Sequence, residues 1–460
     1  MSADVREYRY AAEAESEAED AATEERRRRH VDWQFMILTV LLLVIGLVIL
    51  FSASFANSYF DYNDAGYVFK NQLTWAVIGV IAMMFATTVR VSSLRRAPGT
   101  VRGLAKVRYL SYRRMAAAML YVSIILLFLT ITPLPIAAAR NGAKRWLNLV
   151  AFQFQPSEVV KIGLILAFAK MLCDDRRNLR LGRVKRAPGE RIRKAGFTRS
   201  VLPFGIILAV IIIILALQPH FSAAIIICAI AVIMLFTGGL DERVMAAGII
   251  LAAVGVVAVI VYIEKSYAAA MLKMEQEIAD GANRQVALQN FRAALGDFHF
   301  ARIVSWLHPE ADPSGGSYQI NQSLYAIGSG GLLGVGLGQS RQKVSYLPEE
   351  HNDYIFSVYC EELGFIGAIL LIFIFALLII RGFWIAMHAK DKFSSLVVIG
   401  IMGMFAVQVF FNIGVVTNLL PSTGISLPFF SYGGTALMIQ LFEMGIVLSA
   451  SRDMKLTRKG

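Results

Sequence analysis

The sequence predicts an all-α polytopic membrane protein with ten transmembrane helices and a large extracytoplasmic loop between helices seven and eight. Hydrophobic residues make up 57% of the 460 residues and charged residues only 17%, whereas soluble domains use about 25% charged residues. The mean hydropathy is +0.58. Apolar runs long enough to cross about 30 Å of hydrocarbon recur along the chain, and the basic residues are unequally distributed between the segments that separate these runs.

The apolar runs define ten expected spans. We expect each of them to be a helix, because a chain in lipid must satisfy its backbone hydrogen bonds within each span. They lie near residues 34–52, 73–89, 115–133, 157–173, 201–217, 220–238, 244–263, 354–380, 394–418 and 431–451. We therefore expect a ten-helix domain over 33–451, a tail over 1–32 and a second tail over 452–460. Residues 1–25 hold nine acidic residues and almost no large apolar ones, which predicts disorder.

The basic residues predict the orientation. Of the 45 Lys and Arg residues, 32 lie in the N-terminal tail and in the segments on its side of the membrane, and 11 lie in the segments on the other side. The remaining two, Lys161 and Lys170, fall within the fourth span. Cytoplasmic segments are enriched in Lys and Arg, so both termini are predicted to be cytoplasmic. The net charge of +12 then reflects topology, with attraction to anionic membrane lipids as a secondary effect, and no nucleic-acid partner is expected.

The outward segment 264–353 is about ninety residues long, and loops of this length are usually functional or disordered. Its first part, 264–302, mixes Ala, Leu and Met with charges at helical spacing, which predicts amphipathic helices on the outer leaflet. Its second part, 306–353, is rich in Gly, Pro and polar residues. We expect the chemistry of the protein to lie here.

Asp312 lies in this second part, between a turn and a Gly-rich stretch. A carboxylate held by rigid neighbours can act as a general base on a substrate hydroxyl. The plainer interpretation is that Asp312-Pro313 only forms a turn, with Asp bonding its own backbone. From spacing alone the turn is favoured.

Two further stretches of this loop are open to more than one interpretation. The Gly-rich run 328–338 could cradle a phosphate, but it lacks the Lys-Ser/Thr of a nucleotide loop, so close helix packing or a tight re-entrant turn is favoured and no nucleotide is expected. Glu349, His351 and Asp353 could in principle bind a metal ion, but no second His is nearby in the sequence. A hydrogen-bonded loop is the favoured interpretation.

Charges also occur at the outer end of the fourth span. Glu158 and Lys161 are three residues apart on one helical face, which is either a functional site or an ion pair that packs two helices, and we weigh the two equally. Arg140, Lys144 and Arg145 precede them in an outward loop, against the orientation rule. Binding of an anionic headgroup such as a pyrophosphate would explain these cations.

Two other outward connections depart from regular helix. Residues 421–434 hold two Pro, several Gly and hydroxyl residues, and Gln218-Pro219-His220 is too short for an ordinary loop. Non-helical backbone at membrane depth is tolerated where it is buried in protein or lines a cavity. We therefore expect a polar cavity that opens outward.

The chain holds, in this order, the motifs Lys144-Arg145-Trp146, the segment 154–161, Tyr318-Gln319 to Gly338, the segment 343–353, Glu361-Glu362-Leu363-Gly364 and the segment 421–434. These motifs resemble the SEDS family (shape, elongation, division, sporulation), over residues 33–451. His220 departs from the family, because many members carry Asp after Gln-Pro. The run 336–343 resembles the division and sporulation branch of FtsW and SpoVE more than the RodA branch.

The resemblance implies a peptidoglycan glycosyltransferase that polymerises lipid II into β-1,4 glycan strands at the outer face of the bacterial cytoplasmic membrane, in cell division or sporulation. Asp312 matches the family's essential carboxylate and would be the general base. Undecaprenyl pyrophosphate would be the leaving group, stabilised by cations and, where one is bound, by a divalent ion such as Mg²⁺ or Mn²⁺. The implied partners are lipid II, the nascent glycan strand, a class B penicillin-binding transpeptidase and other divisome or sporulation membrane proteins.

The resemblance also implies which residues contact the substrate. The cations are Arg140, Lys144, Arg145 and Lys343, and the other expected substrate-binding residues are Glu158, Lys161, Tyr318, Gln319, Glu349, His351, Ser422, Thr423 and Ser431. Two alternatives of a different class remain. A lipid II flippase would also use broken helices and a cavity open to lipid, and a non-enzymatic division scaffold would use the basic loops and the acidic tail.

Overall fold

The fold is known from a computed structural model of the chain. The expected tails fall almost entirely outside the residues that it describes, so the disorder of 1–25 stays a prediction. The described residues are 31–91, 111–132, 137–140, 143–149, 152–180, 202–239, 242–281, 283–294, 298–310, 317–344 and 346–454.

A helix overlaps each of the ten expected spans. In chain order these helices are α2 (Trp33–Tyr62), α3 (Tyr67–Thr88), α5 (Tyr112–Leu129), α6 (Pro156–Arg180), α7 (Leu202–Leu217), α8 (Phe221–Gly238), α9 (Glu242–Ala279), α13 (Ile355–Met387), α14 (Lys392–Val416) and α15 (Gly434–Ser451). Eight helices in the described ranges are long and apolar enough to cross a membrane; α7 is a shorter apolar helix, and α6 does not qualify. The chain is therefore a multi-pass helical membrane protein.

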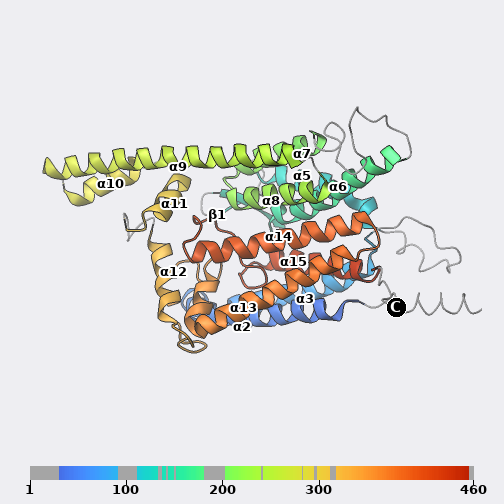
Figure 1. Ribbon diagram of the computed structural model, residues 1–460. Helices are drawn as coiled ribbons and strands as arrows, with labels where there is room; N and C mark the ends of the chain where they lie inside the picture. The colour runs from blue at the N-terminus through green and yellow to red at the C-terminus, as the bar shows by residue number, and fades with distance from the viewer. Residues whose placement is uncertain are drawn as a thin grey trace, which may run out of the picture.

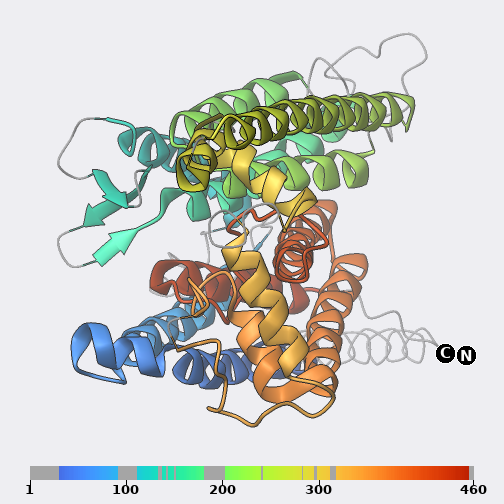
Figure 2. The ribbon, with the colours of Figure 1, turned by 90° about the vertical axis from the view of Figure 1, so that its left-hand side faces the viewer.

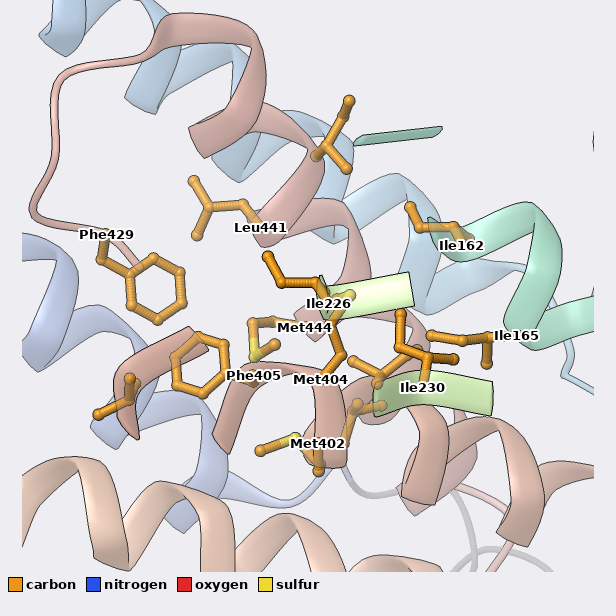
Figure 3. Packing of buried hydrophobic residues seen from close by; sticks show 14 of the residues in the cluster. Ile162, Ile165, Ile226, Ile230, Met402, Met404, Phe405, Phe429, Leu441 and Met444 are labelled. Carbon is orange, nitrogen blue, oxygen red and sulfur yellow. The ribbon is translucent and has the colours of Figure 1, made fainter. Parts of the chain in front are cut away.

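The bundle is held together by close packing around α14 and α15. Phe405 of α14, Met444 of α15 and Ile226 of α8 meet in one buried apolar cluster (Figure 3). The α3–α15 contact depends on small residues, because a Cβ added at Gly445 would meet the carbonyl of Met83. Within lipid, where burial of apolar surface does not drive association, such close backbone approach stabilises helix pairs.

Helix α9 differs from the expectation for its region. It continues without a break from Glu242 to Ala279, 38 residues or about 57 Å, and it projects beyond the other helices (Figure 1). The expected amphipathic helices over 264–302 are therefore an extension of the seventh span followed by α10 (Arg284–Ala294) and α11 (Phe298–Leu307). Ile263 and Ala270 of α9 pack with Phe291 and Val304 in a small separate core.

A small sheet, which the sequence did not predict, lies between α5 and α6. Its strands are β1 (Ala137–Arg140), β2 (Ala143–Leu149) and β3 (Phe152–Phe154), antiparallel in that order. It stands at one side of the bundle in Figure 2. The strands are short and their apolar residues do not alternate regularly, which leaves little period-two signal to detect.

Candidate functional site

Strand β2 presents Arg145 to the connection between α7 and α8. Arg145 is half-buried, whereas its neighbour Lys144 is exposed, as expected for residues on opposite faces of a strand. The Arg145 guanidinium donates hydrogen bonds to the carbonyl of Gln218, at 3.5 Å, and to the carbonyl of Pro219. The short connection that the sequence marked as irregular thus fixes the position of this cation.

The same connection places a neutral histidine beside the cation. His220 precedes the first turn of α8, and its Nε2 atom lies 3.3 Å from Nε2 of Gln155. Burial, followed by the nearby positive charges of Arg145 and Lys161, lowers the pKa of His220 to about 3. His220 is therefore uncharged at neutral pH and adds no further positive charge.

Glu158 and Lys161 form the predicted ion pair in α6, with Nζ and Oε2 2.7 Å apart. The Lys161 side chain is buried. Glu443 of α15 interacts electrostatically with both residues, and neither of its carboxylate oxygens has a hydrogen-bond partner in the described part of the chain. A buried charge needs a partner, so α6 and α15 share a polar cluster within the bundle.

Arg302 of α11 and Asp353, which precedes α13, form the centre of the site. The Arg302 Nη1 atom donates to the carbonyl of Ser422 at 3.4 Å. Asn412 of α14 donates to the carbonyls of Asp353, at 2.7 Å, and Ile425, at 2.8 Å, which fixes the backbone on both sides.

Gly424 marks the point where these elements converge. A Cβ added there would lie 3.3 Å from Oδ2 of Asp353, 3.5 Å from Oγ of Ser222 and 3.9 Å from Nη1 of Arg302. Its φ of 71° is also in the left-handed region that favours glycine. The Ser222 hydroxyl donates to the carbonyl of Thr423 at 2.5 Å, so the loop 417–433 is held against α8 and α11.

The charged groups of this cluster shift one another's pKa values. Burial, and then the negative charge of Glu349, raises the pKa of Asp353 to about 6, although Arg302, Arg145 and His351 act in the opposite direction. Burial and then Arg302 lower the pKa of Arg145. Two guanidinium groups that destabilise each other's charge favour the binding of an anion between or beside them.

The structure therefore brings together some of the predicted residues and adds others. Arg145, Glu349, His351, Ser422 and Thr423 lie around Asp353, and Lys161 with Glu158 lies beyond His220. Ser431 is a structural residue of the loop, since its hydroxyl donates to the carbonyl of Asn352 at 2.7 Å and accepts from the amide of Leu427.

Arg302 and Asp353 were not among the predicted site residues. Arg302 is an outward cation, so the argument that singled out Arg145 could have found it. The sequence presents Asp353 as a candidate metal ligand and as the last residue of the motif 343–353. Its interaction with Arg145 joins segments more than 200 residues apart, and Arg302 lies in a third segment, so no local pattern reveals the cluster.

Lys343, Tyr318 and Gln319 have contacts outside the Asp353 cluster. The Lys343 ammonium is 2.7 Å from Oε1 of Glu362 and 3.0 Å from Oγ of Ser52, and the side chain is buried. These contacts fasten its loop to α2 and α13. Tyr318 is the first residue of α12 (Tyr318–Ser329), and Gln319 donates to the carbonyl of Pro348 at 3.2 Å.

Asp312 and the side chain of Arg140 lie outside the described part of the chain. Described residues before and after the segment that contains Asp312 make defined contacts. The His308 ring stacks on Tyr267, with centroids 4.1 Å apart, and Asn321 donates to the carbonyl of Pro309 at 3.2 Å. The described residues contain no group of three or more His, Cys, Asp or Glu that could hold a metal ion, and the expected divalent cation stays a prediction.

Comparison with known proteins identifies relatives over nearly the whole chain. Residues 32–456 match the family described as cell cycle protein FtsW/RodA/SpoVE. Stage V sporulation protein E of Bacillus subtilis is 35% identical over 422 residues, which cover 92% of this chain and 97% of that protein. A probable peptidoglycan glycosyltransferase FtsW of Trichlorobacter lovleyi is also 35% identical, over 94% of this chain and 95% of that protein.

Two solved structures share the fold. A chain from a peptidoglycan synthase complex that coordinates polymerization and crosslinking is 24% identical, with a TM-score of 0.63 over 92% of this chain and 98% of that chain. The rod shape determining protein RodA of Thermus thermophilus is 23% identical, with a TM-score of 0.57 over 93% of this chain and 99% of that one.

Proposed function

Because the chain belongs to the FtsW/RodA/SpoVE family of cell cycle proteins, the SEDS family, we propose that it is a peptidoglycan glycosyltransferase of cell division or sporulation. Its substrate is lipid II, which it polymerises into β-1,4 glycan strands at the outer face of the cytoplasmic membrane. The observation that supports this proposal best is the convergence of Arg145 and Arg302 near Asp353. Paired guanidinium groups match the geometry and charge of a pyrophosphate.

The proposed topology has ten spans with both termini in the cytoplasm. Helices α6 and α7 span the membrane in addition to the eight that qualify by length and hydropathy. Residues 160–169 of α6 are buried inside the bundle, which accommodates the charges of that helix. Segment 264–353 is then extracytoplasmic, as the orientation rule requires, and Arg145, Arg302 and Asp353 share the outer side.

Asp312 is the proposed general base. The 4-hydroxyl of the acceptor GlcNAc is a weak nucleophile, and Asp312 would remove its proton as the oxygen attacks C1 of the donor MurNAc. Inversion at C1 gives the β-1,4 bond, and the bond from C1 to the pyrophosphate breaks. Arg145 and Arg302 would stabilise the negative charge that develops on undecaprenyl pyrophosphate.

A divalent cation fits this site as an accessory. Mg²⁺ is commonly held by one or two carboxylates together with substrate phosphates, and Asp353 with its neighbour Glu349 could supply these carboxylates. Such an ion would neutralise charge on the leaving group. The arginines hold the pyrophosphate whether or not the ion is present.

The proposed partner is a class B penicillin-binding transpeptidase. The support is by analogy, since one structural neighbour belongs to a peptidoglycan synthase complex that coordinates polymerization and crosslinking. Polymerised strands need to be crosslinked, so a polymerase and a transpeptidase act on the same product. Further divisome or sporulation membrane proteins would complete the assembly.

The experiment that tests the function is a lipid II polymerisation assay on purified protein, alone and with its transpeptidase. We expect glycan strands from the wild type and a loss of at least about 100-fold for Asp312→Asn, because general-base catalysis contributes about that much or more. Glu310→Gln, an exposed carboxylate in the same segment, should retain activity.

The alternatives give different results in the same assay. Normal polymerisation by folded Asp312→Asn would contradict the role of Asp312. Movement of lipid II across vesicle membranes without polymer would support the flippase. Normal cell growth with Asp312→Ala at normal abundance would support the non-enzymatic scaffold.

A further inference from the structure

The Gly-rich loop that follows α12 exposes apolar side chains at the surface of the protein. Leu332 is 69% and Leu333 79% exposed, and Val335 and Leu337 are about half exposed. No Asp, Glu, Lys or Arg occurs between Asp312 and Arg341. A contiguous exposed apolar stretch without charges marks a surface that contacts something apolar.

The backbone of this loop is paired with a break in α13. Gly364 has φ 66° and ψ −170°, which interrupts the helix and leaves peptide groups on either side of it available. The amides of Val335 and Gly336 donate to the carbonyls of Glu361 and Glu362, both at 3.0 Å. In return, the amides of Phe365 and Ile366 donate to the carbonyls of Gly331 and Leu332, at 2.9 and 3.1 Å.

This pairing is what a non-helical segment needs in order to enter lipid. An unsatisfied peptide group in hydrocarbon is strongly unfavourable, and the break in α13 provides hydrogen-bond partners for the part of the loop that it pairs with. The carboxylate of Glu361 also accepts from the Ser340 hydroxyl and the Arg341 amide, and Glu362 pairs with Lys343. The loop is therefore clamped to α13 at both ends.

The length of α13 indicates that the membrane surface lies near the helix break at Gly364, where the loop is paired. The whole helix has 33 residues, about 50 Å, which is longer than the hydrocarbon core of about 30 Å. The part from Phe365 to Met387 measures about 34 Å and fits that core. Phe365, Ile366 and Phe373 are each more than half exposed on this part, as side chains that face lipid are.

We propose that residues 330–338 form a membrane-inserted loop whose leucine side chains enter the interfacial region of the bilayer next to Phe365 and Ile366. Its occupant is lipid, because the apolar surface of the loop is continuous with the lipid-facing surface of α13. In the proposed orientation this is the outer leaflet. The loop and the helix break together set the depth at which the bundle sits in the membrane.

Site-specific fluorescence measures this depth directly. The probe NBD is attached at Leu333→Cys, or in a second variant at Leu337→Cys, with Cys173, Cys228 and Cys360 replaced by Ala. The full-length protein is reconstituted into phosphatidylcholine and phosphatidylglycerol vesicles that contain nitroxide lipids, labelled near the headgroup or deep in the acyl chain. Two reference positions are Phe373→Cys on the lipid-facing side of α13 and Asp61→Cys in the exposed last turn of α2.

We expect the probes at 333 and 337 to be quenched by the shallow nitroxide more than by the deep one, and to be protected from iodide in the water. The probe at 373 should respond more to the deep nitroxide, and the probe at 61 to iodide alone. Quenching of 333 and 337 by iodide alone would overturn the proposal. Protection of both from nitroxide and iodide would also overturn it, since protein would then cover the loop.

Discussion

Arg145 and Arg302 bring two positive charges to one place from different parts of the chain. Arg145 comes from β2 and is held by the carbonyls of Gln218 and Pro219, and Arg302 comes from α11 and is held by the carbonyl of Ser422. Neutral carbonyls are among the groups that orient these two guanidinium groups. Asp353 is a carboxylate that interacts with both, and a bound pyrophosphate would bring further negative charge to the two guanidinium groups.

Replacing either arginine should therefore weaken binding of the lipid-linked substrate. We expect Arg145→Gln or Arg302→Gln to raise KM for lipid II about tenfold or more, because hydrogen bonds to charged groups contribute about 1.5–3 kcal/mol. The measurement is the steady-state rate of polymerisation against lipid II concentration. Lys70→Gln is the control, since Lys70 is an exposed cation that pairs with Asp64 and is not among the expected substrate-binding residues. Equal effects of all three changes would argue against a specific site.

Asp353 should make the stability of the protein depend on pH. Its pKa is raised from 3.8 to about 6, so the folded protein holds this proton more strongly than the unfolded chain does. The stabilisation is complete below about pH 4 and is lost as the pH rises through about 6. We expect Asp353→Asn to flatten the dependence of Tm in detergent on pH between these values, and Asp61→Asn to leave it unchanged. A profile of Asp353→Asn that matches the wild type would contradict this assignment.

At the scale of single elements, the break in α13 determines how the Gly-rich loop is held. A Cβ at Gly364 would meet the amide nitrogen of Gly334 and the carbonyl of Leu332, and its positive φ with extended ψ is a conformation that essentially only glycine adopts. The pairing of the loop and the break in the helix therefore both require glycine at position 364. The sequence indicated close packing or a tight turn at the glycines, but the partner segment was not evident.

Gly364→Ala should destabilise the protein by about 3 kcal/mol or more, from backbone strain together with the steric overlap. Gly255→Ala in α9 is the matched control, because a Cβ there meets nothing within 4 Å. That change should be neutral or slightly stabilising, since Ala has the higher helix propensity. Chemical unfolding in detergent measures both, and similar free energies of unfolding for the two variants would refute the structural role of Gly364.

Helix α6, a proposed span that does not qualify by hydropathy, carries charged residues inside the bundle. Glu158 and Lys161 neutralise each other at 2.7 Å, and Glu443 of α15 lies within electrostatic range. The sequence left open whether this pair is functional or a packing contact. The observed ion pair supports the packing interpretation. Lys161 also lies close enough to His220 for its positive charge to lower the pKa of His220.

For the whole molecule, the orientation in the membrane decides which groups can meet an extracytoplasmic substrate. The asymmetry of 32 to 11 basic residues predicts that both termini are cytoplasmic. The connection between α9 and α10, at the end of the projecting helix, would then be outside.

Reporter fusions test this orientation. Alkaline phosphatase inserted after Gly281 should be active, because it requires an extracytoplasmic location, whereas the same enzyme fused after Gly460 should be inactive. Green fluorescent protein fused after Gly460 should fluoresce as a cytoplasmic protein does. An active phosphatase at Gly460 would reverse the topology and place the Asp353 cluster on the wrong side for lipid II polymerisation.

Much of the architecture follows from local sequence, and the arrangement of the site does not. Hydropathy and basic charge are properties of one segment at a time, because each apolar run must be stable in lipid independently of the others. A helix therefore overlaps each of the ten apolar runs. The orientation can be predicted by counting basic residues. Which polar residues meet depends on how distant segments pack. That packing pairs Lys343 with Glu362, although the family resemblance implied that Lys343 contacts the substrate. It also brings Arg302 and Asp353 to Arg145.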